Sequence, residues 1–169
     1  VVGEKLSVED AVQWAIENEV SFIDCRIDLP PNALESFDEA RCAPIRDACA
    51  AHGIHLGLHT LSAVNIAEVS PFLRDAADAY LMAYIDATKR LNAGWVEVHA
   101  GYHFTSDVEL RMSAGLERLR RATAYAESQG VQLLLENLNW EPEHAEVNYL
   151  AHTVEECQYY FDAIQSPVL

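Results

Sequence analysis

The sequence has 169 residues, half of them apolar, which suits one domain with a hydrophobic core and argues against a disordered chain. The net charge is −16, with 27 acidic residues against 11 basic ones, and it disfavours nucleic acid and anionic membranes as partners because phosphates bind basic surfaces. No apolar run approaches the ~20 residues of a membrane span, and Val1–Asp10 lacks a signal-peptide pattern, so we expect a cytoplasmic protein.

Helix and strand signals alternate along the chain. Capping residues and apolar periodicity predict helices over 8–19, 36–52, 70–91, 106–129 and 153–164. Short apolar or alternating runs predict strands between these helices, over 20–28, 54–60, 95–100 and 131–139. Loops are expected at 101–105 and at 138–152, and the second is long enough to suggest a functional loop.

The helix starts rest on capping motifs. Capping-box pairs stand at Ser7/Asp10, Ser36/Glu39, Ser106/Glu109 and Thr153/Glu156, and Ser70-Pro71 places a proline at a first helical position. Pro44 also permits a later start for the second helix. The four cysteines form no Cys-x-x-Cys pair, as expected for free thiols in a cytoplasmic protein.

Strands that alternate with helices predict an α/β fold with a parallel sheet and right-handed crossovers. We interpret residues 1–169 as a single domain. In parallel α/β proteins, ligands and metals bind at the carboxyl ends of the strands. The residues that end each predicted strand are therefore the first candidates for a site.

Three such residues occupy the same relative position. His59, His99 and Glu136 each stand near the end of an apolar strand segment. In adjacent parallel strands, about 5 Å apart, these side chains would enter one cavity. Two imidazoles and a carboxylate are ligands for Zn²⁺, Mn²⁺ or a similar divalent ion. A hydrogen-bonded histidine or a solvated carboxylate is the alternative for each residue taken alone.

Other polar residues near the strand ends are candidates for supporting roles. His55 and Glu97 lie on the same strand faces. As a buried pair they would orient the site residues, or they would form an ion pair in the core. Arg26 would hold a substrate oxygen, with an internal Asp24–Arg26 pair as the alternative. Trp140 and His103 stand on loops at this edge and are candidates for substrate contact, with loop packing and surface exposure as alternatives.

These segments resemble the xylose isomerase-like TIM-barrel superfamily, which includes sugar isomerases and epimerases, inosose-processing enzymes and the endonuclease IV type of apurinic endonuclease. The matching segments are Gly57-Leu58-His59-Thr60 with Asn65, Val96-Glu97-Val98-His99-Ala100-Gly101, and Leu134-Leu135-Glu136-Asn137. They span most of the chain, and Asn137, beside Glu136, joins the substrate-binding candidates. The resemblance implies a (β/α)8 barrel of which about the first five βα units are present, so we expect the sequence to be truncated at both ends.

The resemblance also implies a function. It indicates a metal-dependent isomerase or epimerase that acts on a sugar or sugar derivative by proton transfer next to a carbonyl. Glu136 would be a ligand of the divalent metal (Mn, Zn, Mg or Co) and the acid/base, and in endonuclease-type members His59 and His99 would match zinc ligands. The alternatives are an endonuclease IV-like enzyme, and a non-catalytic barrel or subunit completed by a partner. A sugar-like small molecule is the expected partner, and a homo-oligomer is left open.

Overall fold

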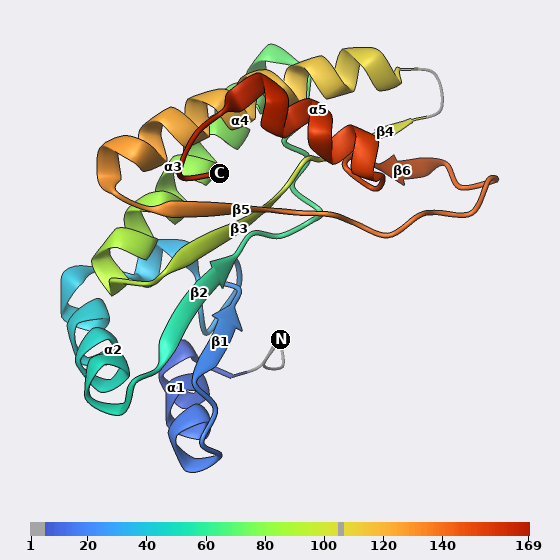
Figure 1. Cartoon of the computed structure of the whole chain (residues 1–169). Helices are drawn as coiled ribbons and strands as arrows, with labels where there is room; N and C mark the ends of the chain where they lie inside the picture. The colour runs from blue at the N-terminus through green and yellow to red at the C-terminus, as the bar shows by residue number, and fades with distance from the viewer. Residues whose placement is uncertain (1–5, 105–106) are drawn as a thin grey trace.

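The computed structural model describes residues 6–104 and 107–169 (Figure 1). Its helices are α1 (Val8–Glu17), the 3-10 turn η1 (Leu34–Ser36), α2 (Glu39–His52), α3 (Pro71–Leu91), α4 (Val108–Gln129) and α5 (Val154–Ile164). Its strands are β1 (Phe22–Cys25), β2 (His55–His59), β3 (Trp95–His99), β4 (Tyr102–Phe104), β5 (Gln132–Glu136) and β6 (Val147–Tyr149).

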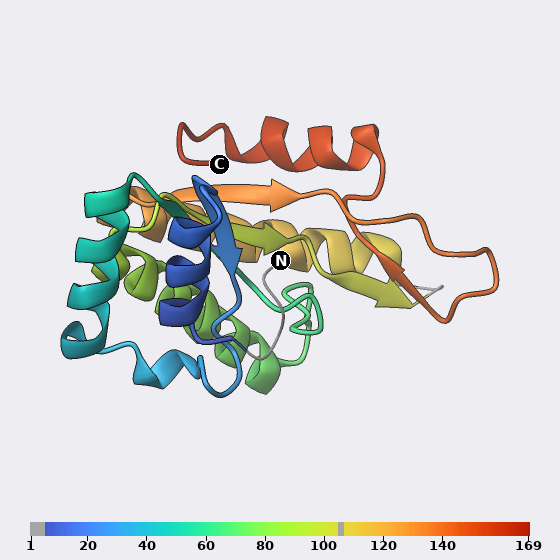
Figure 2. The ribbon, with the colours of Figure 1, turned by 90° about the horizontal axis from the view of Figure 1, so that it is seen from below.

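Four strands form one parallel sheet in the order β1-β2-β3-β5. The sheet is curved, and the helices lie along its outer face and its edge (Figures 1 and 2). The α/β prediction is confirmed, and the arrangement is that of a partial (β/α)8 barrel, because the strands run in sequence around the sheet with a helix after each.

The strands bury one face and leave the other open. Ile23, Leu58, Val96 and Leu133 point toward the helices and are at most 5% exposed. The alternate residues lie on the concave face, where Phe22 is 65% exposed. This alternation follows from the two-residue period of a strand, and it places every polar strand residue of interest on the concave side.

The predicted helix starts have mixed outcomes. Ser7 and Thr153 cap α1 and α5 as predicted, each accepting a hydrogen bond from the backbone N–H three residues on. The Ser36 cap is wrong: Asp38 caps α2 and accepts from the N–H of Arg41 at 2.9 Å, because Ser36 closes the preceding 3-10 turn. Pro44 lies inside α2 and does not delay its start. The predicted cap at Ser106 lies outside the described residues.

The two predicted loops at 101–105 and 138–152 are only partly correct. Each contains a three-residue strand, and β4 pairs with β6 as an antiparallel ribbon. The ribbon continues beyond the carboxyl ends of β3 and β5 (Figure 2). A strand of three residues gives too short an alternation to stand out in the sequence. In the described parts of the chain, no helix is both long enough and apolar enough to cross a membrane.

Gly101 makes the turn between β3 and β4. Its φ is +95°, and an added Cβ would lie 2.6 Å from Asn65 Oδ1 and 2.7 Å from the Ala67 backbone nitrogen. We therefore expect Gly101→Ala to lower the free energy of unfolding by about 2–4 kcal/mol in urea titrations. Gly94→Ala is the matched control, because a Cβ there meets only the Leu56 carbonyl oxygen at 3.8 Å. Equal stability of the two variants would contradict this account of the turn.

Candidate metal centre at the carboxyl ends of the strands

His59, His99 and Glu136 are the last residues of three neighbouring strands, β2, β3 and β5. His99 and Glu136 are direct partners in the register of β3 and β5. His59 lies beside Glu97, two residues before His99 on β3. The shared end position predicted from the sequence is therefore present in the fold.

The three side chains converge on one point. His99 Nε2 lies 2.7 Å from Glu136 Oε2, and His59 Nε2 lies 3.5 Å from the same oxygen. The two Nε2 atoms are 3.2 Å apart. His99 is only 3% exposed. These residues form one of two groups of potential metal ligands, within the described ranges, whose ligand atoms all lie within 4.8 Å of one another.

The hydrogen bonds behind His59 set its tautomer. Its Nδ1 lies 2.9 Å from Asp24 Oδ2 and 3.5 Å from Glu97 Oε2. An ionised carboxylate only accepts hydrogen bonds, so the proton of a neutral imidazole belongs on Nδ1. The Nε2 lone pair of His59 then faces His99 and Glu136.

Thr60 lies behind His99. Its hydroxyl is 3.0 Å from the Glu97 carbonyl oxygen and 3.3 Å from His99 Nδ1, and a hydroxyl can donate to either or accept from an Nδ1–H. With its proton on Nε2, neutral His99 donates to Glu136 Oε2 at 2.7 Å; with its proton on Nδ1, the ring presents an Nε2 lone pair to a cation.

Burial and neighbouring charges shift the pKa values around this point. Burial lowers the pKa of His99, which favours the neutral ring. The hydrogen bond with Asp24 raises the pKa of His59. Burial and, after it, the neighbouring Asp24 carboxyl group raise the pKa of Glu97 to about 7. Three carboxyl groups crowd two imidazoles here, and such a concentration of titratable groups is typical of a functional site.

The two residues predicted to support the site lie in different places. Glu97 lies beside His59, within 3.5 Å of its Nδ1. His55 does not: it stands at the amino end of β2 and stacks on Phe22 at 4.6 Å between ring centroids. Four residues of strand separate His55 from His59, which is about 13 Å. Sharing a face does not bring two strand residues to the same end.

Arg26 and Asn137 each follow the last residue of a strand. Arg26 is half-buried after β1, and Asn137 is exposed after β5. Their roles in substrate binding stay predictions. The alternative that paired Asp24 with Arg26 missed the contact of Asp24 with His59. The sequence did hold a signal for this contact. Asp24 lies on the same strand face as Phe22, so its carboxylate points toward the concave face of the sheet, beside β2.

His103 and Trp140 lie together in a second place, away from His59, His99 and Glu136. They line a cavity of about 230 Å³ between the β4–β6 ribbon and the loop after β5. Tyr149 and His152, which the sequence did not single out, line the same cavity. None of His59, His99 and Glu136 is among its lining residues.

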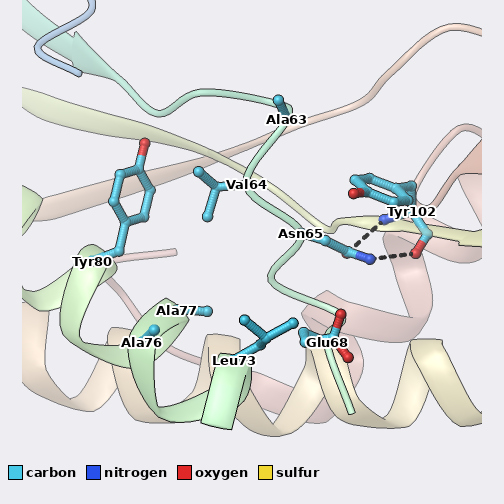
Figure 3. A pocket seen from close by; sticks show the side chains of 9 residues that line it. All are labelled: Ala63, Val64, Asn65, Glu68, Leu73, Ala76, Ala77, Tyr80 and Tyr102. Atoms are coloured by element: carbon cyan, nitrogen blue, oxygen red, sulfur yellow. Dashed lines mark hydrogen bonds between the residues drawn. The ribbon is translucent and has the colours of Figure 1, made fainter. Parts of the chain in front are cut away.

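A larger cavity of about 400 Å³ lies between the loop after β2, α3 and Tyr102 (Figure 3). Its polar groups are committed to the protein. Asn65 Oδ1 accepts from the N–H groups of Ala67 and Tyr102, and Asn65 Nδ2 donates to the Tyr102 carbonyl. Tyr80 donates to Asp28 at 2.6 Å and accepts from the Leu61 N–H at 2.9 Å. These bonds hold the loop in place and leave the cavity itself largely apolar.

The sequence model of the xylose isomerase-like TIM-barrel family matches residues 12–169. The chain belongs to this family. The family assignment agrees with the parallel sheet, the order of its strands and the polar residues at their carboxyl ends. No curated protein sequence matches the chain significantly.

Solved structures share this family's fold at low sequence identity. A D-tagatose 3-epimerase-like protein has a TM-score of 0.80 and 18% identity over 98% of this chain and 60% of its own. D-psicose 3-epimerase from Clostridium cellulolyticum H10 has a TM-score of 0.78 and 16% identity over 95% and 55%. The probable 3-DHS dehydratase AsbF from Bacillus anthracis has a TM-score of 0.73 and 15% identity over 98% and 57%. The chain thus spans little more than half the length of these proteins.

Proposed function

We propose that this chain forms one wall of the active site of a metal-dependent isomerase or epimerase that acts on a sugar or sugar derivative. His59, His99 and Glu136 hold the divalent ion, and Glu136 also exchanges a proton with the substrate. Asp24 and Glu97 orient His59 from behind. Arg26 and Asn137, at the same edge of the sheet, contact substrate oxygens.

The convergence of three electron pairs carries the proposal. With protons on both Nδ1 atoms, the two Nε2 lone pairs and the Glu136 carboxylate face one another over 2.7, 3.2 and 3.5 Å. A proton on His99 Nε2 forms a hydrogen bond with Glu136 Oε2 but leaves the contacts of the His59 Nε2 lone pair, and burial disfavours a positive charge on His99. A divalent cation relieves all three. Two imidazoles with one carboxylate suit Zn²⁺, Co²⁺ or Mn²⁺ better than Mg²⁺, which prefers oxygen ligands.

The chain's own groups suit proton transfer next to a carbonyl. A bound divalent ion would polarise the substrate oxygens and make the neighbouring C–H more acidic. Glu136 has a second carboxylate oxygen to accept that proton, and its place at the end of β5 points the group toward the concave side. The buried His99 and Thr60 keep water away from the rear of the site.

The relatives support the reaction class. Three of the solved structures with this fold are named as epimerases of psicose or ribulose. The dehydratase among them means that the fold hosts other chemistry as well, so the reaction must be tested directly. The test is proton exchange in D₂O, with D-fructose and Mn²⁺ or Co²⁺, followed by NMR. Deuterium at the carbon next to the carbonyl is expected, and its absence with every ketohexose tried would contradict the proposal.

The charge of −16 disfavours the endonuclease alternative, since no excess of basic residues is available for a DNA backbone. Binding to abasic duplex DNA at low salt separates the two functions. We expect none, and tight, salt-sensitive binding would favour the nuclease.

Asp24→Asn tests the orientation of His59. The amide can donate as well as accept, so it no longer dictates a proton on His59 Nδ1. We expect a 10- to 100-fold loss of Zn²⁺ affinity, about the cost of removing a partner behind a ligand, with little change in the unfolding midpoint. Calorimetric titration measures the affinity, and the exposed Asp47→Asn is the control. Unchanged affinity in Asp24→Asn would contradict the role of Asp24.

A further inference from the structure

Two tyrosines of α3 hold an aspartate beyond the carboxyl end of β1. Tyr80 donates to Asp28 Oδ1 at 2.6 Å, and Tyr84 donates to Asp28 Oδ2 at 2.7 Å. The tyrosines are four residues apart and therefore share a face of the helix, with ring centroids 5.0 Å apart. Tyr80 rises from α3 toward the strands (Figure 3). Both oxygens of one carboxylate are thus bound to a single helix.

The same two hydroxyl groups also reach the backbone at the strand ends. Tyr80 accepts from the N–H of Leu61, two residues after His59, at 2.9 Å. Tyr84 accepts from the Ile27 N–H at 3.2 Å and lies 3.1 Å from the His59 carbonyl oxygen. A hydroxyl has one proton and two acceptor sites, so each tyrosine can donate to the carboxylate and accept from the backbone at once. The hydroxyl groups therefore tie the segment after β1 to the segment after β2.

Burial makes these hydrogen bonds strong and costly to lose. Tyr84 is 0% exposed, and Tyr80 is half-buried. Burial raises the pKa of both phenols, so each keeps the proton that it donates at neutral pH. A hydrogen bond from a phenol to a carboxylate is charge-assisted and stronger than one between neutral groups. We call Asp28, Tyr80 and Tyr84 the Asp28 network.

The Asp28 network lies where the pairing of β1 with β2 has ended. The last register pair of these strands is Cys25 with Leu58, and His59 is one residue beyond it. Asp24 pairs in register with Gly57, so its 2.9 Å contact with His59 Nδ1 is made between offset residues. Such a contact depends on how the two strand ends lie relative to each other. Just beyond the last register pair, the hydrogen bonds of the Asp28 network fix that relation.

We propose that the Asp28 network consists of positioning residues for His59. It holds the end of β1 against the end of β2, which keeps the Asp24 carboxylate on His59 Nδ1 and turns Nε2 toward the other two ligands. The effect on metal affinity rests on the proposed function. The orientation of the His59 ring does not, because it can be observed in the metal-free protein.

The test compares Tyr80→Phe with Tyr125→Phe. Phenylalanine removes only the hydroxyl group, and at Tyr80 this frees one oxygen of Asp28 and the Leu61 N–H. Tyr125 is the matched control, because its hydroxyl also donates to an aspartate, Asp86, at 2.7 Å, but joins α4 to α3 instead of the strand ends. Both variants should unfold at a slightly lower urea concentration, so stability alone does not reveal positioning.

NMR of the metal-free protein reports the His59 ring. Its Nδ1–H, bonded to Asp24, should give a resonance that shifts or weakens by exchange with water in Tyr80→Phe and persists in Tyr125→Phe. Calorimetric Zn²⁺ affinity should fall about tenfold or more in Tyr80→Phe, the range for a ligand that loses its partner, and stay unchanged in Tyr125→Phe. Tyr84→Phe should behave like Tyr80→Phe and keeps the test informative if that variant does not fold.

Two results would overturn the positioning role of the Asp28 network. One is a His59 resonance and a Zn²⁺ affinity that stay unchanged in both α3 variants. The other is an equal change in Tyr125→Phe, which would mean that any lost tyrosine–aspartate bond loosens the site. If the unchanged protein binds no Zn²⁺, the proposed metal centre fails, and the His59 resonance alone decides the role of the Asp28 network.

Discussion

Replacing Glu136 by glutamine is expected to abolish proton exchange and to weaken Zn²⁺ binding by more than about 100-fold. This loss of affinity is larger than the roughly 10- to 100-fold that follows when a metal ligand loses a hydrogen-bond partner. The amide is neutral and removes the one negative charge that Glu136 Oε2 places 2.7 Å from His99 Nε2 and 3.5 Å from His59 Nε2. It also removes the proposed base. Both losses arise from the same atom, so affinity and activity should fall together.

Calorimetry with Zn²⁺ and proton exchange in D₂O measure the two effects of Glu136→Gln. Glu109→Gln is the matched control, because Glu109 is exposed on the first turn of α4. Its affinity and activity should equal those of the unchanged protein. Retention of Zn²⁺ affinity in Glu136→Gln would reject Glu136 as a ligand, and retention of activity would reject it as the base.

Replacing Arg118 by leucine is expected to lower the free energy of unfolding by about 3–5 kcal/mol, as when one member of a buried charged pair is removed. Arg118 is 1% exposed and lies 3.1 Å from Asp78. Its guanidinium also donates to the Ile66 carbonyl and, at 3.3 Å, to the Glu68 carbonyl. Leucine fills part of the space but leaves these carbonyl oxygens without their donor.

Urea unfolding of Arg118→Leu should be compared with that of Arg121→Leu. Arg121 also binds Asp78, at 3.0 Å, but it is 41% exposed. An exposed pair contributes little, so Arg121→Leu should cost at most about 1 kcal/mol. Because Arg118 holds the loop after β2 against α4, the loss should also increase hydrogen exchange at Ile66 and Ala67. Equal stability of the two variants would contradict the role given to Arg118.

The parallel sheet could be predicted because its signals are local. Glycine or proline punctuation and apolar periodicity locate β2, β3 and β5, and two of the capping boxes locate α1 and α5. The β4–β6 ribbon could not be predicted. It joins residues 102–104 to 147–149, and its pairing depends on the turn at Gly101 and on long-range contacts that leave no periodic signal.

The convergence of His59, His99 and Glu136 could be predicted in part, but not the side chains that contact His59 from behind. His99 and Glu136 are register partners at the ends of β3 and β5, so their meeting followed from chain position, whereas His59 pairs in register with Glu97 and reaches Glu136 through its side chain. Asp24 was missed because a single carboxylate in a strand does not reveal its partner. His55 was misplaced because the two-residue period of a strand predicts which face a residue lies on, but not how far along the strand it lies from the site.

The most direct test of the proposed metal centre is anomalous X-ray diffraction from crystals grown with Zn²⁺. One peak is expected between His59 Nε2, His99 Nε2 and Glu136 Oε2, at about 2.0–2.2 Å from each atom. His59 Nδ1 should remain within hydrogen-bond distance of Asp24, as it is now at 2.9 Å. A map with no peak there, or with Zn²⁺ bound only at other residues, would contradict the account.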